Sequence, residues 1–175
     1  MEKILVINSS PRKNGNSEIL CDRLIEGAES KGACCEKINL REMNIGYCIG
    51  CDACRRNDGT CVIKDDMEWI FQKMLTADIV VLSTPVYFFT LSAQLKTLID
   101  RLHNGYKKMA GKNFVLLQQC QFPSLNVLKG HSIRCVDFST AYLIQRSLVW
   151  YAAIMPGLLV KIERQKHMMK HMSLE

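Results

Sequence analysis

The 175-residue chain is of single-domain size, and its 48% hydrophobic and 23% charged content excludes a wholly disordered protein. Most of its net charge of +6 lies after residue 117, and no basic stripe interleaved with aromatic residues precedes that point, so nucleic-acid binding is not expected. We expect neither a signal peptide nor a membrane span, and therefore a cytoplasmic protein whose nine cysteines stay reduced.

The first elements follow the order strand, loop, helix, strand. The apolar run Lys3–Asn8 predicts a strand, and the polar loop after it leads into a helix with apolar residues at helical spacing. This helix is expected to run to about Lys31, where Gly32 ends it, and an extended segment should follow over 35–40. Together these segments form a βαβ unit.

Residues 42–65 are interpreted as a cysteine-rich insertion after the second strand. Their cysteines have the spacing Cys-x2-Cys-x2-Cys-x6-Cys, at Cys48, Cys51, Cys54 and Cys61. Four thiolates that converge on one small volume are the ligands of a [4Fe–4S] cluster, and Gly50 and Gly59 give the backbone the freedom to turn around it. Structural zinc is a second interpretation, although its usual pattern is two Cys-x2-Cys pairs further apart. Unmetallated or redox-active thiols are a third.

Helices and strands continue to alternate after the insertion. Asp65–Glu68 should cap a helix, 79–82 reads as a strand buried on both faces, and 83–88 should leave the sheet. A helix over 91–102 and a strand over 113–117 follow. The alternation predicts an α/β fold with a doubly wound parallel sheet, whose ligand sites lie at the carboxyl ends of the strands.

The loop after the first strand is rich in hydroxyl and amide side chains and precedes a helix N-terminus, a combination that favours an anion. It lacks the glycine patterns of triphosphate and dinucleotide sites, which leaves the monophosphate of flavin mononucleotide (FMN) as a suitable ligand. Arg12 would bring positive charge, and hydrogen bonds would come from Ser9, Ser10, Asn16 and Ser17. The alternative is a solvated loop in which Asn16 or Ser17 caps the helix.

A second loop, Pro85, Val86, Tyr87 and Phe88, follows the buried strand at the same edge of the sheet. Pro85 stiffens the backbone there, and Tyr87 or Phe88 offers a ring face on which an isoalloxazine could stack. Alternatively, these aromatic residues cap the core or fill a subunit interface.

With these segments identified, residues 1–117 resemble the flavodoxin-like NADPH-dependent FMN reductase family and, within it, the iron–sulfur flavoproteins. The resemblance rests on Ser9 to Ser17, Cys48 to Cys54 with Cys61, and Ser83 to Phe88. It implies that the first loop, Asn14 included, binds the FMN phosphate, and that Pro85 to Phe88 contact the flavin ring. It also implies a [4Fe–4S] cluster on the four cysteines near a subunit interface, in a homodimer or tetramer.

The resulting interpretation is an FMN-dependent oxidoreductase that transfers electrons, with NAD(P)H or a ferredoxin as donor. The cofactors do the chemistry, so no residue is given a catalytic role, and His103 is read as a helix-end residue. One alternative is a cluster-free NAD(P)H-dependent FMN or quinone reductase. Another, of a different class, is a binding module stabilised by zinc.

Residues 118–175 either complete the same domain or form an out-of-frame tail. The resemblance stops after Leu117, and the segment 166–172 is unusually rich in histidine and methionine. Reading one nucleotide earlier permits segments similar to the family both there and over 129–142. We therefore hypothesise a frameshift near residue 118.

Overall fold

The computed structural model describes residues 1–88, 90–119 and 150–153. Five parallel strands form one sheet in the order β2-β1-β3-β4-β5. They are β1 (Lys3–Asn8), β2 (Cys34–Asn39), β3 (Ile79–Pro85), β4 (Asn113–Gln119) and β5 (Trp150–Ala153). This order confirms the predicted doubly wound α/β fold of flavodoxin-like type, in which the chain changes direction across the sheet between β1 and β3.

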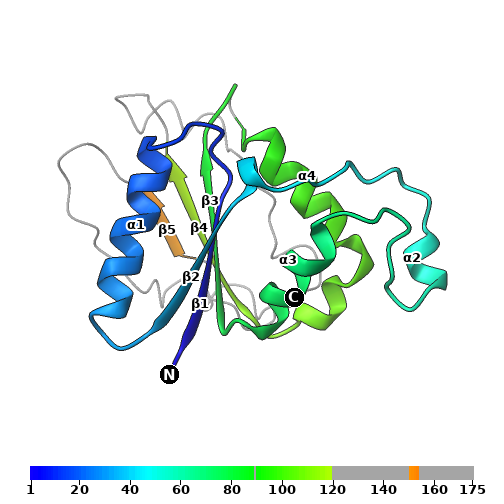
Figure 1. The fold of residues 1–175 in the computed structure, drawn as a ribbon, viewed down its shortest axis with the longest axis horizontal. Coiled ribbons are helices and arrows are strands. Elements are labelled where there is room, and N and C mark those ends of the chain that lie inside the picture. Colours follow the sequence, from blue (N-terminus) through cyan, green and yellow to red (C-terminus); the bar gives the residue numbers. More distant parts are fainter. Residues whose placement is uncertain (89, 120–149, 154–175) are drawn as a thin grey trace, which may run out of the picture.

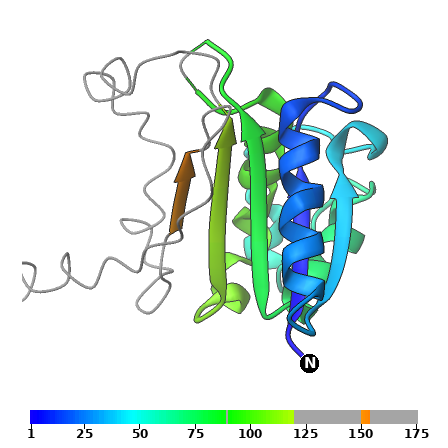
Figure 2. The same ribbon diagram turned by 90° about the vertical axis from the view of Figure 1, so that its left-hand side faces the viewer.

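Helices cover both faces of the sheet (Figures 1 and 2). On one face, α1 (Asn16–Glu29) packs through Cys21 and Leu24 against Val6 and Val81. On the other, α3 (Met67–Thr76) and α4 (Ala93–Arg101) form a larger core through side chains such as Ile70 and Leu98. Because β1 and β3 bury alternate residues on each face, their runs 4–7 and 79–82 are apolar without a break, as expected for a central parallel sheet.

At the carboxyl edge of the sheet, one predicted boundary and one alternative are wrong. β3 does not end at residue 82 but continues to Pro85, because Ser83 and Thr84 stay paired with β4 and are buried. The alternative in which Asn16 or Ser17 caps the first helix is also wrong. Gly15 is the N-cap residue, and Asn16 is already helical.

One of the two predicted carboxylates makes a hydrogen bond that caps α3. Asp66 occupies the N-cap position of α3 without a side-chain cap bond, whereas Oδ1 of Asp65 accepts a hydrogen bond from the Met67 amide at 3.1 Å. Asp66 instead accepts one from the Asn44 amide at 2.7 Å. The two aspartates therefore tie the start of α3 to the segment before the cysteines.

The cysteine-rich segment lies between the 3₁₀ turn η1 (Leu40–Glu42) and α3. It leaves the sheet past α4, forms the short helix α2 (Ala53–Arg56) and returns to α3 (Figure 1). Two 3₁₀ turns, η2 (Leu102–Asn104) and η3 (Tyr106–Met109), follow α4 beside it. No helix in the described ranges is long and apolar enough to cross a bilayer.

β5 is the one part of the predicted tail that the structure describes beyond β4, and it pairs with β4 in parallel from Val115↔Trp150 to Gln118↔Ala153. The runs 129–142 and 166–172, on which the frameshift hypothesis rests, lie outside the described residues. Both interpretations of the tail stay predictions.

Candidate functional site

The two predicted FMN loops meet at the carboxyl ends of β1 and β3. Asn8, the last residue of β1, is paired with Ser83 of β3. The next residue, Ser9, donates two hydrogen bonds to the Ser83 carbonyl, from its amide at 2.9 Å and from its hydroxyl at 2.7 Å. The first loop therefore starts beside the point from which the second departs, at the switch point where α/β sheets bind ligands.

A buried group of hydroxyls fixes this junction. Ser92, the N-cap residue of α4, donates from its hydroxyl to that of Ser9 at 2.8 Å, and its amide donates to Oγ1 of Thr84 at 3.0 Å. All three side chains are buried, so the Ser9 hydroxyl has its partners inside the protein. Sequence reasoning did not identify Ser92, although a serine directly before a helical apolar pattern is a cap signal.

The first loop turns through side chain to backbone hydrogen bonds. Oδ1 of Asn8 accepts from the Ser10 amide at 3.2 Å, and the Ser10 hydroxyl accepts from the Arg12 amide at 3.3 Å. Asn14 is left-handed, with φ 56°, a conformation that asparagine tolerates better than most residues. The loop is thus held in one shape before α1 begins.

The N-terminus of α1 presents donors at the end of this loop. The amides of Asn16 and Ser17, the first two of the helix, make no hydrogen bond within the residues that the structure describes. Arg12, Asn14 and Asn16 are exposed, while Ser17 is buried. Free amides, a helix dipole and an exposed guanidinium together suit an anion.

Glu18, which sequence reasoning missed, stabilises the same helix terminus. Its carboxylate accepts two hydrogen bonds from Arg41, at 3.1 and 2.9 Å, and one from the Asn14 amide at 2.7 Å, with Nζ of Lys37 3.8 Å away. The Arg41 hydrogen bonds, above all, lower the pKa of Glu18 despite its burial. Its negative charge is therefore compensated and does not oppose an anion nearby.

The second loop is a tight turn with an exposed tip. Tyr87 and Thr90 exchange amide to carbonyl hydrogen bonds at 2.9 and 3.1 Å, and Phe88 between them has φ 46°. A positive φ is unusual for a bulky residue and indicates a strained backbone. The Phe88 side chain is 94% exposed, so the alternative in which it caps the core is wrong.

All four predicted metal ligands line one pocket, together with Arg101 and His103. Cys48 and Cys51 are exposed, Cys54 and Cys61 are half-buried, and all four are free thiols. Across residues 1–88, 90–119 and 150–153, no three His, Cys, Asp or Glu side chains are grouped closely enough to hold a metal ion. The fold thus brings the cysteines to one pocket without drawing their sulfurs together.

His103 lies just past the end of α4, as predicted, and contacts the cysteine segment. Its Nε2 is 3.2 Å from both Nε of Arg55 and Oδ1 of Asp52, at the start of α2. Its ring also stacks on Tyr106, with centroids 6.3 Å apart. His103 therefore anchors α2 against the end of α4.

Arg101, another residue that sequence reasoning missed, is buried at the base of the segment. Its guanidinium makes a two-point ion pair with Asp65, at 2.6 and 3.0 Å, and donates to the Gly46 carbonyl at 2.8 Å. Burial acts to raise the pKa of Asp65, but the hydrogen bonds from Arg101 and from the Gly46 and Met67 amides lower it overall. Within the described residues, the Nε atom of Arg101 is buried and has no hydrogen-bond partner.

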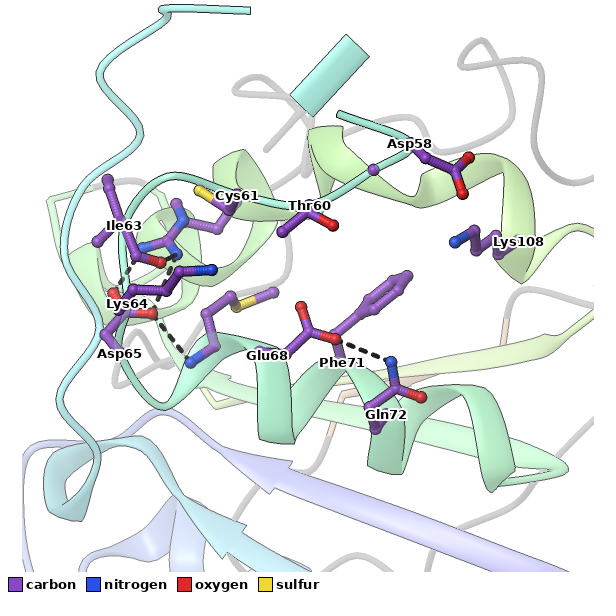
Figure 3. Close-up of a pocket in the computed structure, with 13 residues that line it drawn as sticks. Asp58, Thr60, Cys61, Ile63, Lys64, Asp65, Glu68, Phe71, Gln72 and Lys108 are labelled. Carbon is purple, nitrogen blue, oxygen red and sulfur yellow. Dashed lines mark hydrogen bonds and ion pairs between the residues drawn. The ribbon is translucent and has the colours of Figure 1, made fainter. Parts of the chain in front are cut away.

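A second cavity, of about 520 Å³, lies between the returning limb of the segment and α3 (Figure 3). Thr60 and Cys61 face it from the limb, Glu68 and Phe71 from α3, and Lys108 from η3. Cys61 and Arg101 border both this cavity and the pocket of the four cysteines.

Comparison with known proteins gives matches in sequence and in fold. A family model described as NADPH-dependent FMN reductase matches residues 2–128, past the residue at which the resemblance was expected to end. An iron–sulfur flavoprotein of Methanocaldococcus jannaschii is 40% identical over 99 residues, covering 57% of this chain and 51% of that protein. The chain spans about half the length of the curated relatives it matches.

Solved structures share the fold at low sequence identity. An NAD(P)H:quinone oxidoreductase from Methanothermobacter marburgensis has a TM-score of 0.69 at 16% identity, covering 90% of this chain and 87% of that one. An FMN-dependent NADH-azoreductase from Bacillus anthracis, in complex with FMN, has a TM-score of 0.64 at 16% identity, covering 87% of each chain. These similarities support the fold alone.

Proposed function

The chain belongs to the NADPH-dependent FMN reductase family, and on that premise we propose that it binds FMN between its two strand-end loops and acts as a flavin oxidoreductase. One observation carries the proposal. The hydrogen bonds that join Ser9, Ser83 and Ser92 hold both loops at the switch point of the sheet, beside the first amides of α1.

The first loop takes the FMN phosphate. The amides of Asn16 and Ser17 supply neutral donors, the side chains of Ser10, Asn14 and Asn16 add polar groups from the same loop, and Arg12 supplies positive charge. Ser9 contributes by holding the base of the loop, because its hydroxyl is already bonded to Ser83 and Ser92.

The second loop takes the flavin ring. Pro85 ends β3 in a fixed direction, and the hydrogen bonds between Tyr87 and Thr90 hold the turn, which contains Val86 to Phe88. A half-exposed Tyr87 and an exposed Phe88 offer aromatic surface beside the phosphate loop. Bound FMN would supply hydride and single-electron transfer; the residues of both loops bind and orient it.

The cysteine segment holds an iron–sulfur cluster in this proposal, as the names of the relatives suggest for those proteins. Two observations support a metal-bound group: the four cysteines line one pocket, and a buried donor of Arg101 at that pocket has no acceptor among the described residues. Thiolate ligands would provide negative charge beside that donor. Assembly requires the four sulfurs to move closer together, because no such group is formed in the described residues.

A reduced nicotinamide nucleotide is the proposed electron donor, with a ferredoxin as the second candidate. The family description supports the nicotinamide, and the cluster would suit a one-electron carrier. We further propose a homodimer or tetramer, with the exposed apolar residues Tyr47, Ile49 and Val62 of the cysteine segment at the subunit interface.

The test of the flavin site compares FMN with riboflavin, which lacks only the phosphate. The fluorescence of added FMN should be quenched at a much lower concentration of flavin-free protein than the fluorescence of added riboflavin. In the absence of oxygen, NADPH should then bleach the bound flavin. Equal affinity for both flavins would remove the phosphate site. A colourless protein that contains zinc and binds neither flavin would support the zinc-stabilised binding module instead.

A further inference from the structure

One side chain, Arg101 of α4, closes the base of the cysteine segment. Its guanidinium donates to the Gly46 carbonyl, which precedes the four cysteines, and pairs with Asp65, which follows them. Asp65 in turn accepts a hydrogen bond from the Gly46 amide at 2.8 Å. Both ends of the segment are therefore held at one buried point.

The guanidinium has one donor left over. Arg101 is 3% exposed, and its Nε–H has no acceptor within the described part of the chain. Natural proteins rarely leave a buried donor unpaired, because losing its hydrogen bond to water without replacement is costly. An unpaired donor at a pocket therefore indicates an acceptor that belongs there.

Cys61 lies beside the Arg101 guanidinium. Arg101 and Cys61 border the same pocket, and Figure 3 shows Cys61 near Ile63 and Asp65 at one end of the neighbouring cavity. The pKa of Arg101 is raised, mainly by its hydrogen bonds to Asp65, and Cys61 adds to this increase. A neutral thiol is a weak acceptor, whereas a metal-bound thiolate carries the negative charge that an Arg N–H prefers.

We propose that Arg101 is a positioning residue of the cysteine site, and that its Nε–H donates to the sulfur of Cys61 when that sulfur is bound to iron. The inference rests on the proposed cluster. Arg101 then has two effects: it fixes the ends of the segment, and it stabilises negative charge on one ligand. Hydrogen bonds to cluster sulfurs raise the reduction potential, so the second effect can be measured separately from the first.

The test uses anaerobically purified full-length protein and the variant Arg101→Lys. Lysine keeps a positive charge for Asp65 but lacks the planar fork of donors that can serve Asp65 and Cys61 together. The expected result is retained FMN and iron with a more negative midpoint potential in an EPR-monitored titration. Arg55→Lys is the matched control, because Arg55 belongs to the cysteine segment but is exposed and contacts Asp52 and His103. Its potential should stay at the wild-type value.

A second measurement needs no change at residue 101. In wild-type protein labelled with 15N-arginine, the spin of the reduced cluster should show a hyperfine coupling to an arginine nitrogen, and Arg55→Lys should retain it. A loaded cluster with no such coupling, or an Arg101→Lys potential equal to wild type, would overturn the Arg101 proposal alone. Wild-type protein without iron would overturn the proposed cluster and this inference with it.

Discussion

The two candidate cofactor regions of this molecule differ in how completely the protein alone builds them. At the strand-end loops, the side chains that shape the site are buried and bonded to one another, as Ser9, Thr84 and Ser92 show. In the cysteine segment, the hydrogen bonds lie at the base, around Arg101 and Asp65, while the four cysteines themselves are exposed or half-buried.

This difference follows from what each cofactor needs. A phosphate is bound by amides and hydroxyls that a strand, a loop and a helix terminus already arrange, so the site forms with the fold. A cluster supplies the attraction that draws its ligands together, so its segment only needs to be anchored at both ends. Variants in the two regions should therefore respond differently.

Loss of the anchor, the buried ion pair of Arg101 with Asp65, should have the largest effect on stability. Asp65→Ala leaves the buried Arg101 guanidinium without its carboxylate, which typically costs about 3–5 kcal/mol. The free energy of unfolding from urea titrations should fall by that amount. Lys73→Ala is the control, because its pair with Glu36 is partly exposed and should contribute less than about 1 kcal/mol. Equal losses in the two variants would show that the anchor has no special role.

Arg12→Ala should have the next largest effect, on the flavin site. Loss of a charge-assisted hydrogen bond to phosphate costs about 1.5–3 kcal/mol, which raises the Kd for FMN roughly 10- to 100-fold. Riboflavin affinity should not change, because it has no phosphate. Lys13→Ala, an exposed neighbour in the same loop, serves as the control. An unchanged FMN affinity in Arg12→Ala would remove Arg12 from the site.

Ser9→Ala should mainly reduce stability. Its hydroxyl joins the Ser83 carbonyl to Ser92, so its loss should lower the free energy of unfolding by about 1 kcal/mol and leave FMN affinity within a few-fold. Ser30→Ala removes an exposed hydroxyl and should stay within about 0.5 kcal/mol. A large loss of FMN affinity with unchanged stability would make Ser9 a direct flavin contact.

The smallest effect is expected on acidification above pH 5. The pKa values of Glu18 and Asp65 are lowered from 4.5 and 3.8, so both carboxylates stabilise the folded state above these values. That contribution should be complete from pH 7 to 5 and should fall as the pH drops through the lowered pKa values. Glu18→Gln and Asp65→Asn should flatten this acid dependence in thermal melts. A loss of stability between pH 7 and 5 that both variants abolish would contradict the assignment.

The sequence predicted the fold because the apolar pattern and the topology depend on the same residues. Val80 to Leu82 are buried on both faces as their unbroken apolar run indicates, and this places the following loop at the carboxyl edge. The end of β3 was missed because Ser83 and Thr84 look like loop residues. Their burial depends on partners in Ser9 and Ser92 that are distant in the chain.

In the two candidate sites, too, the sequence predicts local features but not contacts between residues that are distant in the chain. Cysteine spacing identified the members of one pocket, since that information is local. Local spacing could not predict the roles of Arg101 and Glu18. A basic residue at a helix end and an acidic residue in a first turn are ordinary, and only the fold shows that they bind Asp65 and Arg41.

The most direct test of this contrast is the content of iron, sulfide, zinc and FMN per chain, measured in anaerobically purified wild type and in Cys51→Ala. We expect about one FMN and about four irons in the wild type, and FMN without iron in the variant, because the strand-end loops form independently of the cysteines. Loss of FMN and iron together in Cys51→Ala would contradict this account, as would a wild-type protein that contains neither.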